Sequence, residues 1–402
     1  MKLSLRVYMF RDVAVIGCGM TRFGRRDDKT LMNLLIDSSL KAIQDANIEE
    51  SDIDALFVAN MLAEKLNHQT LIATALADQL GLRSASADRI ENGTASGGSA
   101  VRNACLAVAS GAHDLVLVTG GEKMTHASSE RVTDIIATMN HPAEYMQGVT
   151  LSALAAMFAR LYMGKYGVEQ KHMAMVAVKN HSNALKNPYA HLHRRVTLDE
   201  ILYAKGGEVK NPIVAEPLRL FDCCPVSDGA ASVILCSTEK ARKFNDTPIV
   251  IAGFGQANDN LGVYEREDVT ILWSLREASR QAFNMAKLEP DDIDVAELHD
   301  AFTILEIAES EDAGFFKKGT GHRALEEGST SLSGKLPINV SGGLKARGHP
   351  IGATGVAQIV ELTWQLRGEA GARQVAGAEK AFSCNSGGFA SNMVAFVMER
   401  SS

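Results

Sequence analysis

Four short segments of the chain combine reactive side chains with glycines. Histidine, cysteine and hydroxyl side chains can move protons or attack carbonyl groups, while glycines let a substrate carbonyl approach the main chain. The four segments are Glu91–Gly98, Glu297–Phe302, Gly348–Gly355 and Cys384–Gly388. The first and third each end a predicted loop and begin a predicted helix. Unpaired N–H groups and the helix dipole would stabilise thiolates or oxyanions there.

The hydrophobic pattern predicts alternating strands and helices around these segments. Strands are expected at Val13–Ile16, Asp54–Ala59 and Asp114–Val118, and helices at Leu31–Ala46, Leu71–Leu80, Ser96–Ser110 and Leu151–Tyr166. Strands that are apolar on both faces and alternate with helices indicate a mostly parallel sheet covered by helices. The pattern therefore predicts an α/β fold.

An internal repeat indicates that this α/β unit is duplicated. Residues 42–54 and 282–294 share six identical residues at a constant offset of 240. Each copy combines the end of a helix, a short acidic turn and the start of a strand. A weaker similarity pairs the glycine-led helix after Ser96 with the glycine-led helix after Ala353. Two similar halves are therefore predicted.

The region between the two halves, about residues 125–225, differs in character and is locally basic. Residues 160–210 contain nine Lys and Arg against four Asp and Glu, a local charge of +5 in a chain of net charge −7. Two interpretations remain open. The region is either a solvated surface lobe or a local attractor for a phosphate-bearing substrate.

Composition excludes several classes of protein. The chain has 402 residues, of which 46% are apolar and 22% charged, so it is neither disordered nor basic enough to attract nucleic acid or an anionic membrane. No apolar run approaches the ~18–20 residues of a bilayer span. The first residues lack a signal-peptide cleavage site. These features predict a cytoplasmic globular protein.

Most of the six cysteines are expected to be structural. They show no CxxC pattern, so neither a disulfide framework nor a metal site is predicted. Five are interpreted as buried structural thiols: Cys18, Cys105, Cys223, Cys224 and Cys236. The segment Gly17–Arg22 only half-matches a dinucleotide-binding loop, because Arg22 stands where a glycine is needed.

Together the four segments resemble the thiolase family, in its archaeal or sterol-carrier-type branch of acetyl-CoA acetyltransferases. GGLKARGHPIGATG (342–355) matches the family's GHPxGxTG signature, and its proline separates it from the related ketosynthases. His349 falls on the catalytic histidine and Cys384, in CNSGG, on the acid/base cysteine. His299, in HDAF, takes the place of the Asn of the NEAF motif, as in those two branches. DCCPVSDGAA (222–231) resembles the segment that re-enters the N-terminal half.

The resemblance runs from about Val13 to Val397 and implies a thiolase fold. In that fold two duplicated βαβαβαββ halves form a five-layer αβαβα core with an inserted loop domain. The N-terminal half would comprise residues 1–124 and 226–247, the coenzyme A-binding loop domain 125–225, and the C-terminal half 248–402.

The family also implies the ligands and partners. Coenzyme A or an acyl-CoA would be the substrate, with no tightly bound cofactor and no metal. A homodimer or dimer of dimers is expected, with a small OB-fold/zinc-ribbon accessory subunit as a further partner, and neither nucleic acid nor membrane.

The position of the family's nucleophile departs from the pattern. Thiolases of this branch read E-x-x-C-A-S-G-G, whereas Glu91–Gly98 has Thr94 in place of the cysteine. A thiol titrates near ~8.5 and can be ionised near neutrality beside a histidine, but an alcohol needs a base during attack. Three explanations are open. Thr94 is a substituted nucleophile, natural or engineered; the fold runs a reaction without an acyl-enzyme; or the protein binds acyl-CoA without turning it over.

The resemblance assigns a role to each reactive side chain. Thr94 would stand at the nucleophile position, and His349 would activate it and define one oxyanion site. His299 would hydrogen-bond the thioester oxygen of the second acyl unit. Cys384 would shuttle the proton at the α-carbon or the departing thiolate.

The remaining implied contacts concern substrate oxygens. Main-chain N–H groups at Thr94 and near Gly388 would form the second oxyanion hole, and Asn339 and Ser341 would lie at the substrate. The predicted activity is acyl-CoA C-acyltransferase on a 3-oxoacyl-CoA. A carbon–carbon lyase acting on a CoA ester and a non-catalytic acyl-CoA-binding subunit of a multienzyme complex are the alternatives.

Overall fold

The computed structural model describes residues 10–203, 210–244 and 248–401. The predictions that concern residues 1–9, Lys205 and Glu208 lie outside these residues. The strands are β1 (Val13–Met20), β2 (Ala55–Ala59), β3 (Ser86–Ile90), β4 (Leu115–Glu122), β5 (Ile213–Ala215), β6 (Leu218–Arg219), β7 (Gly229–Ser237), β8 (Ile249–Asn258), β9 (Val295–Glu297), β10 (Lys380–Gly387) and β11 (Asn392–Arg400). The helices are α1 (Leu31–Ala46), α2 (Ala63–Asn67), α3 (Ile72–Gln79), α4 (Ser96–Ala109), α5 (Ser129–Ala137), α6 (Pro142–Tyr145), α7 (Leu151–Tyr166), α8 (Gln170–Ala184), α9 (Leu198–Tyr203), α10 (Thr238–Ala241), α11 (Trp273–Ala286), α12 (Thr303–Asp312), α13 (Gly321–Glu326) and α14 (Ile351–Arg367).

Both halves contribute to one hydrogen-bonded sheet, in the order β3-β2-β4-β7-β1-β8-β11-β10-β9. Strands β1 and β8 join the halves, with Val13 opposite Ile251. The expectation of a mostly parallel sheet is wrong. Within the sheet formed by the described residues, only β2 with β3, β2 with β4 and β9 with β10 pair in parallel, and the other pairs are antiparallel. Helices cover both faces, so β2, which has parallel neighbours, and β1, which has antiparallel neighbours, are both largely buried on the two faces. The apolar pattern therefore does not report strand direction.

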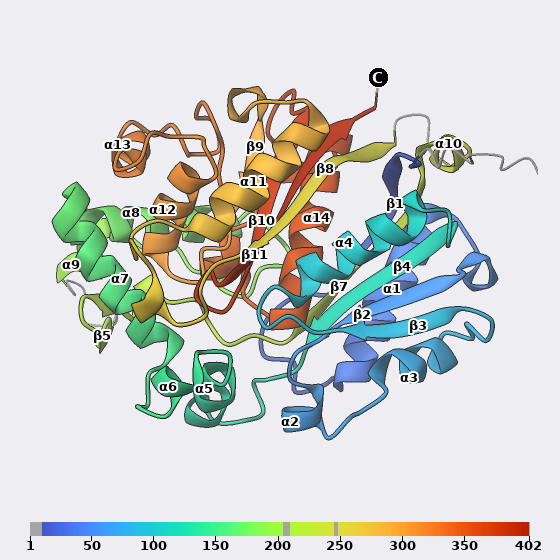
Figure 1. The fold of residues 1–402 in the computed structure, drawn as a ribbon, viewed down its shortest axis with the longest axis horizontal. Coiled ribbons are helices and arrows are strands. Elements are labelled where there is room, and N and C mark those ends of the chain that lie inside the picture. The colour runs from blue at the N-terminus through green and yellow to red at the C-terminus, as the bar shows by residue number, and fades with distance from the viewer. Residues whose placement is uncertain (1–9, 204–209, 245–247, 402) are drawn as a thin grey trace, which may run out of the picture.

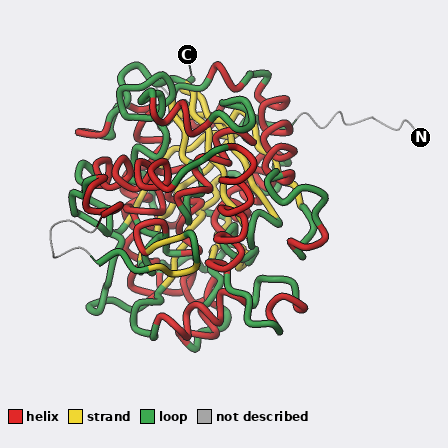
Figure 2. The backbone as a smooth tube through the Cα atoms, turned by 90° about the vertical axis from the view of Figure 1, so that its left-hand side faces the viewer, coloured by secondary structure: helices red, strands yellow, loops and turns green. Residues whose placement is uncertain are grey.

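The elements form the five layers that the duplicated fold predicts (Figure 1). Helices α1 and α3 cover the outer face of the N-terminal half, and α11 and α12 cover the outer face of the C-terminal half. Helices α4 and α14 lie between the two halves. Figure 2 shows the strands inside the molecule with helices around them. Within the described residues, no helix is both long and apolar enough to cross a membrane.

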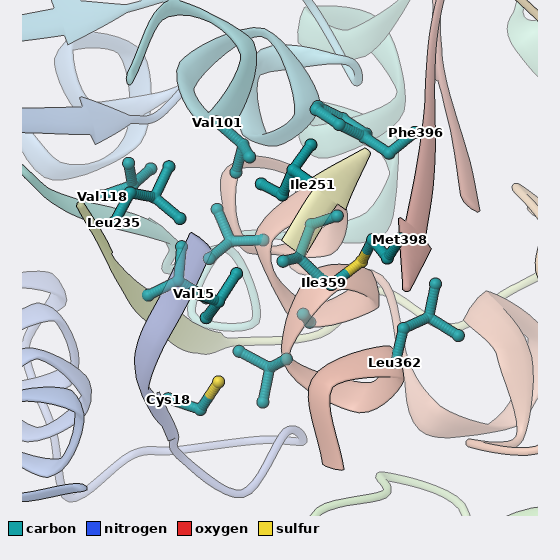
Figure 3. Close-up of a cluster of buried hydrophobic side chains, with 14 of the residues drawn as sticks. Val15, Cys18, Val101, Val118, Leu235, Ile251, Ile359, Leu362, Phe396 and Met398 are labelled. Atoms are coloured by element: carbon teal, nitrogen blue, oxygen red, sulfur yellow. The ribbon is translucent and has the colours of Figure 1, made fainter. Parts of the chain in front are cut away.

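The central layer holds an extensive apolar cluster (Figure 3). Ile359 and Leu362 of α14 are fully buried there, as is Val101 of α4. They pack against strands of both halves, including Leu235 of β7 and Phe396 of β11. Burying such side chains contributes roughly 1.5–3 kcal/mol each, so this cluster fixes α4 and α14 between the two halves of the sheet.

The predicted repeat has the same backbone structure in both copies. Helices α1 and α11 end at the matching residues Ala46 and Ala286, and a left-handed residue follows each of them. Each of these helices is also contacted, at matching helix residues, by a glycine of the strand that precedes it. A Cβ on Gly17 would lie 2.2 Å from the carbonyl oxygen of Ala42, and one on Gly253 would lie 2.1 Å from that of Ala282. The duplication therefore includes the close contact between strand and helix.

The basic region between the halves contains α5 to α9 and the β5–β6 hairpin. Part of its charge is neutralised by acids from elsewhere in the chain. Lys165 pairs with Asp268, Lys171 with Glu326 and Lys179 with Glu306, at 2.6, 3.1 and 3.0 Å. Three arginines of the region are exposed: Arg160, Arg194 and Arg195. The charge available to a ligand is therefore smaller than the count of basic residues suggests.

Glycines bring the first turns of α4 and α14 into direct backbone contact. A Cβ on Gly355 of α14 would lie 2.2 Å from the amide nitrogen of Gly98, and one on Gly97 would lie 2.7 Å from the nitrogen of Gly355. On the other side, a Cβ on Gly352 would lie 2.4 Å from the carbonyl oxygen of Ala59. No other residue type permits such approaches without movement of the backbone.

We expect Gly355→Ala to destabilise the protein, because the added methyl group meets main chain that cannot yield. Overpacking of this kind costs about 1–3 kcal/mol. The matched control is Gly164→Ala in helix α7, where a Cβ meets no atom within 4 Å. That variant should gain about 0.5–1 kcal/mol from its helix propensity. Urea unfolding measures the free energy of unfolding of both variants. Equal values for the two variants would contradict the backbone contact.

Candidate active site

A cavity of about 140 Å³ brings together Thr94, His299 and His349, three of the residues predicted to be catalytic. Ser386 and Gly388 also line it. The rest of its wall is largely apolar, and includes Met124, Ile136, Leu151, Phe302, Leu305 and Phe389. Two reactive imidazoles and a hydroxyl group therefore lie in the wall of a small and largely apolar cavity.

Each reactive residue is positioned by the end of a regular element. Thr94 lies between β3 and α4, and His349 lies just before α14. His299 follows β9, and Gly388 follows β10. The contact between α4 and α14 thus sets the separation of Thr94 from His349, and the pairing of β9 with β10 sets that of His299 from Gly388.

A second close contact ties the HDAF segment to the loop that carries His349. The carboxylate of Asp300 accepts a hydrogen bond from the backbone N–H of Leu344 at 2.6 Å. A Cβ on Gly343 would lie 2.3 Å from this carboxylate, and Gly343 has a φ of +58°. A glycine is therefore required there for both space and conformation. A π-helical turn at Gly343–Arg347 then leads to His349.

Hydrogen bonds fix the tautomer of His349. Its Nδ1 lies 2.6 Å from the hydroxyl of Thr354, which donates its own proton to the carbonyl oxygen of Pro350. The hydroxyl oxygen must therefore accept from Nδ1–H. Nε2 is left with its lone pair, so His349 can act as a general base.

Hydrogen bonds fix the opposite tautomer in His299. The side-chain oxygen of Asn385 accepts the backbone N–H of Gly98 at 2.9 Å, which assigns the other end of this amide as the donor. That Nδ2 group lies 3.0 Å from Nδ1 of His299 and 3.2 Å from the carbonyl oxygen of Thr94. Nδ1 of His299 therefore accepts, and its Nε2–H is a hydrogen-bond donor.

Both imidazoles are held in the neutral form. Burial and the nearby guanidinium of Arg347 lower the pKa of His349 from 6.5 to about 3. Burial, His349 and Arg347 lower the pKa of His299 well below 6.5. The two rings lie 5.1 Å apart, edge to face. One neutral base and one neutral donor thus stand next to each other.

The hydroxyl of Thr94 is engaged by main chain and not by either imidazole. Its Oγ1 donates a hydrogen bond of 2.6 Å to the carbonyl oxygen of Ser386. Thr94 is 4% exposed, so this proton has little access to bulk water. Attack by Thr94 would require the hydroxyl to leave Ser386 and turn its proton towards a base.

The structure does not bring Cys384 to the cavity wall. The side chain is fully buried in the cluster of Phe382 and Ala395, on the face of β10 that packs against α12. Successive residues of a strand face opposite sides, so Asn385 instead of Cys384 faces the two imidazoles. Burial and Glu309 raise the pKa of the Cys384 thiol well above 9.0.

Asn339 and Ser341 also lie away from the cavity. Asn339 accepts the N–H of Leu298 at 2.8 Å and donates to Glu306 at 2.7 Å. Ser341 donates to Glu297 at 2.6 Å. Both residues fix the segment that precedes His299.

Cys223 and Cys224, interpreted from the sequence as buried structural thiols, both line the cavity and are partly exposed. Burial raises their pKa values to about 12, so they are thiols and not thiolates. Within the described part of the chain, no group of three or more His, Cys, Asp or Glu side chains is placed to hold a metal ion.

Sequence reasoning missed two residues that define the chemistry of the site, Thr354 and Asn385. Both stand inside the quoted motifs, GHPIGATG and CNSGG. Motif positions alone do not reveal which partner each side chain bonds, because Asn385 and His299 are 86 residues apart in the chain. The signal available in the sequence was Asn385 itself, because its amide side chain stands in a motif that is expected to face a histidine.

Comparisons with known proteins agree on both halves of the chain. The family model "Thiolase, N-terminal domain" matches residues 13–239, and "Thiolase C-terminal domain-like" matches residues 255–400. The chain is 45% identical to the acetyl-CoA acetyltransferase of Methanothermobacter thermautotrophicus over 391 residues, covering 97% of this chain and 100% of the relative. It is 34% identical to human sterol carrier protein 2 over 396 residues, covering 94% of this chain and 70% of the relative.

A solved structure titled "Ltp2-ChsH2(DUF35) aldolase" superposes with a TM-score of 0.80 at 24% identity, covering 98% of both chains. At this identity the similarity concerns the fold alone.

We predict that both imidazoles stay neutral, with opposite tautomers, between pH 5 and 8, where an unperturbed histidine titrates. Ring ¹⁵N shifts of the histidine-labelled protein should place the proton on Nδ1 of His349 and on Nε2 of His299. In Asn385→Asp a carboxylate faces Nδ1 of His299, so only that ring should move its proton to Nδ1 and gain a higher pKa. Titration of either wild-type ring near pH 6.5, or identical tautomers, would refute the assignment.

Proposed function

The chain belongs to the thiolase family, and we propose that it is an acyl-CoA C-acyltransferase that forms or cleaves a 3-oxoacyl-CoA. One observation carries the proposal: a bare imidazole nitrogen and an imidazole N–H donor stand side by side at one small cavity. Transfer of an acyl group between carbon and sulfur needs both. The relatives named acetyl-CoA acetyltransferase support the same class of reaction.

In the proposed thiolytic direction, the side chain at position 94 attacks the 3-oxo carbon while Nε2 of His349 takes its proton. The bond between C2 and C3 then breaks, and the departing acetyl-CoA enolate carries its charge on the thioester oxygen. Nε2–H of His299 donates to that oxygen, and C2 takes the proton held on Nε2 of His349 to complete acetyl-CoA. Free coenzyme A removes the acyl group from position 94 in the second half of the reaction.

Thr94 sets the rate of this reaction. An alcohol is a far weaker nucleophile than a thiolate near neutral pH, and the proton of Thr94 is held by Ser386. The base His349 and the hydrogen-bond donor His299 thus serve an acyl transfer whose first step, the attack by Thr94, is slow.

The same hydrogen bond favours a second candidate, a retro-aldol lyase that needs no acyl-enzyme. His349 would take the proton of a 3-hydroxyl group of a 3-hydroxyacyl-CoA. The bond between C2 and C3 would break to release an aldehyde or ketone, and the acyl-CoA enolate would be held by His299 until C2 takes the proton held on Nε2 of His349. Thr94 would then contribute only shape.

We place the coenzyme A phosphates near Arg194 and Arg195. Both side chains are exposed. The segment just before them bonds to the loop that leads to His349, since the N–H groups of His191 and Leu192 donate to the carbonyl oxygens of Arg347 and Ala346. A homodimer, or a dimer of dimers, and a small OB-fold/zinc-ribbon subunit are the proposed partners.

Thr94→Cys should convert a slow enzyme into a fast one. With acetoacetyl-CoA and free coenzyme A, we expect thiolysis to rise by at least about 10²-fold, because a thiol is far more acidic than an alcohol and its sulfur is a far better nucleophile. Intact-protein mass spectrometry should then detect an acyl group on the cysteine introduced at position 94, and Thr94→Ser serves as the hydroxyl control. No gain in the cysteine variant would count against acyl transfer, and aldehyde release by the wild type from a 3-hydroxyacyl-CoA would favour the lyase.

The size of the cavity predicts a preference for short acyl groups. A cavity of about 140 Å³ is close to the ~150 Å³ that holds one benzene molecule, so we expect room for about six carbon atoms. Affinity measured by calorimetry should fall from butyryl-CoA to decanoyl-CoA in the wild type. Leu151→Ala, which enlarges the cavity, should raise the affinity for decanoyl-CoA on the order of tenfold. The control is Leu161→Ala on the same helix, 52% exposed and away from the cavity. Equal affinities along the wild-type series would refute the size limit.

A further inference from the structure

Helix α12 is buried along its whole length although four of its ten residues are acidic. Three of these acids have cationic partners. Glu306 pairs with Lys179, Asp312 pairs with Arg276 and Lys318, and Glu311 lies 3.8 Å from Lys318. Among the residues that the structure describes, the fourth, Glu309, forms no salt bridge.

Glu309 instead contacts two residues of the candidate active site. Its Oε2 accepts the backbone N–H of His299 at 2.7 Å and the thiol of Cys384 at 3.5 Å. Glu309 is 1% exposed, and Cys384 is fully buried. The carboxyl group therefore lies directly behind His299, on the side away from the cavity.

The chemical state of Glu309 follows from its surroundings. A buried carboxylate without a cation is unfavourable, and Asp300 and Glu306 add negative charge nearby. Burial, with Asp300 and Glu306 nearby, raises the pKa of Glu309 well above 4.5, which favours the neutral carboxylic acid. As an acid it keeps an oxygen that accepts from N–H and S–H, and it adds no charge behind a neutral imidazole.

Two other side chains contact the ring of His299. Asn385 bonds its Nδ1, and the ring of His349 stands edge to face with it. The main-chain N–H of His299 follows the last residues of β9, and it faces both the Glu309 carboxyl oxygen and the Cys384 sulfur. Because sulfur is a weak acceptor, Glu309 supplies the stronger hydrogen bond to this buried donor.

We propose that Glu309 is a positioning residue: by accepting the backbone N–H of His299, it aims the Nε2–H of that ring into the cavity, with Cys384 as its second hydrogen-bond donor. Cys384 thus acts through Glu309 and His299 and does not reach the substrate. The predicted effect of Glu309 on ligand affinity rests on the acyl-CoA function proposed above. The predicted effect of Glu309 on the orientation of His299 does not depend on that function.

The first test measures His299 directly by ¹⁵N NMR, with no substrate. Glu309→Leu has a similar volume but no acceptor, so the main-chain N–H signal and the ring ¹⁵N signals of His299 should both shift. Glu309→Gln keeps an oxygen acceptor and should leave these signals near their wild-type positions. If Glu309→Leu fails to fold, Glu309→Asp, shorter by one methylene group, gives the same comparison. Unchanged His299 signals in a variant without a reaching acceptor would overturn the proposal.

The matched control is Glu311→Gln on the same helix. Glu311 is also a buried carboxyl group, bonded to Tyr162 and to the N–H groups of Gly319 and Gly321. This substitution should lower Tm and leave the His299 signals in place. A shift of those signals as large as in Glu309→Leu would show general loosening of the helix, and would overturn the positioning role.

The second test compares affinities for acetyl-CoA and free coenzyme A. In Glu309→Leu the affinity for acetyl-CoA should fall on the order of fivefold, because only the thioester oxygen uses the Nε2–H of His299. The affinity for free coenzyme A should not change. Equal losses for both ligands would contradict the proposal. A wild-type protein that binds neither ligand would refute the acyl-CoA function, and the NMR result would still decide the role of Glu309.

Discussion

The direct contact between the backbones of α4 and α14 is the constraint on which the site depends. The two helices come from different halves of the duplicated chain, and each carries one reactive residue just before its first turn. Gly98 and Gly355 approach so closely that a Cβ on Gly355 would lie 2.2 Å from the other's amide nitrogen. Any wider spacing would separate Thr94 from His349 and break the bond from Gly98 to Asn385. One steric condition thus sets both the geometry of the cavity and the orientation of the amide that controls His299.

That geometry gives two identical side chains opposite functions. Imidazole offers either a lone pair or a proton at Nε2, and the partner at Nδ1 decides which. A hydroxyl that must accept, Thr354, makes His349 a base, and an amide that must donate, Asn385, makes His299 a donor. Neither partner touches the substrate in the proposed reactions. The chemistry of the cavity is therefore determined one contact behind its wall, and Glu309 extends the same control to the main chain of His299.

The sequence predicts those parts of the site that local motifs carry. The sequence predicts the helix at Leu31–Ala46 and the duplicated helix–turn–strand unit. It also predicts that Thr94, His299 and His349 lie close together. Strand direction could not be predicted, because strands covered on both faces read alike whether parallel or antiparallel. The orientation of Cys384 depends on strand alternation relative to a helix 75 residues away in the chain. Glu309 lies in no recognisable motif, and a glutamate in a helix ordinarily predicts a side chain that faces solvent.

The electrostatics of the site argue for turnover and against simple binding. An unfolded His349 would titrate near 6.5, while the folded one stays neutral to about pH 3. The unfolded chain therefore binds more protons, and stability is lost as the pH falls below 6.5. Arg347 is fully buried, and two of its side-chain nitrogens have no hydrogen-bond partner among the described residues, which lowers the stability of the fold further. Binding a thioester needs only shape and hydrogen-bond donors, whereas a neutral imidazole that offers its Nε2 lone pair at the cavity serves a reaction in which a proton is removed. A chain that keeps such a base beside Thr94 is therefore best explained by a reaction that begins with proton abstraction, whichever atom of the substrate or the protein gives up that proton.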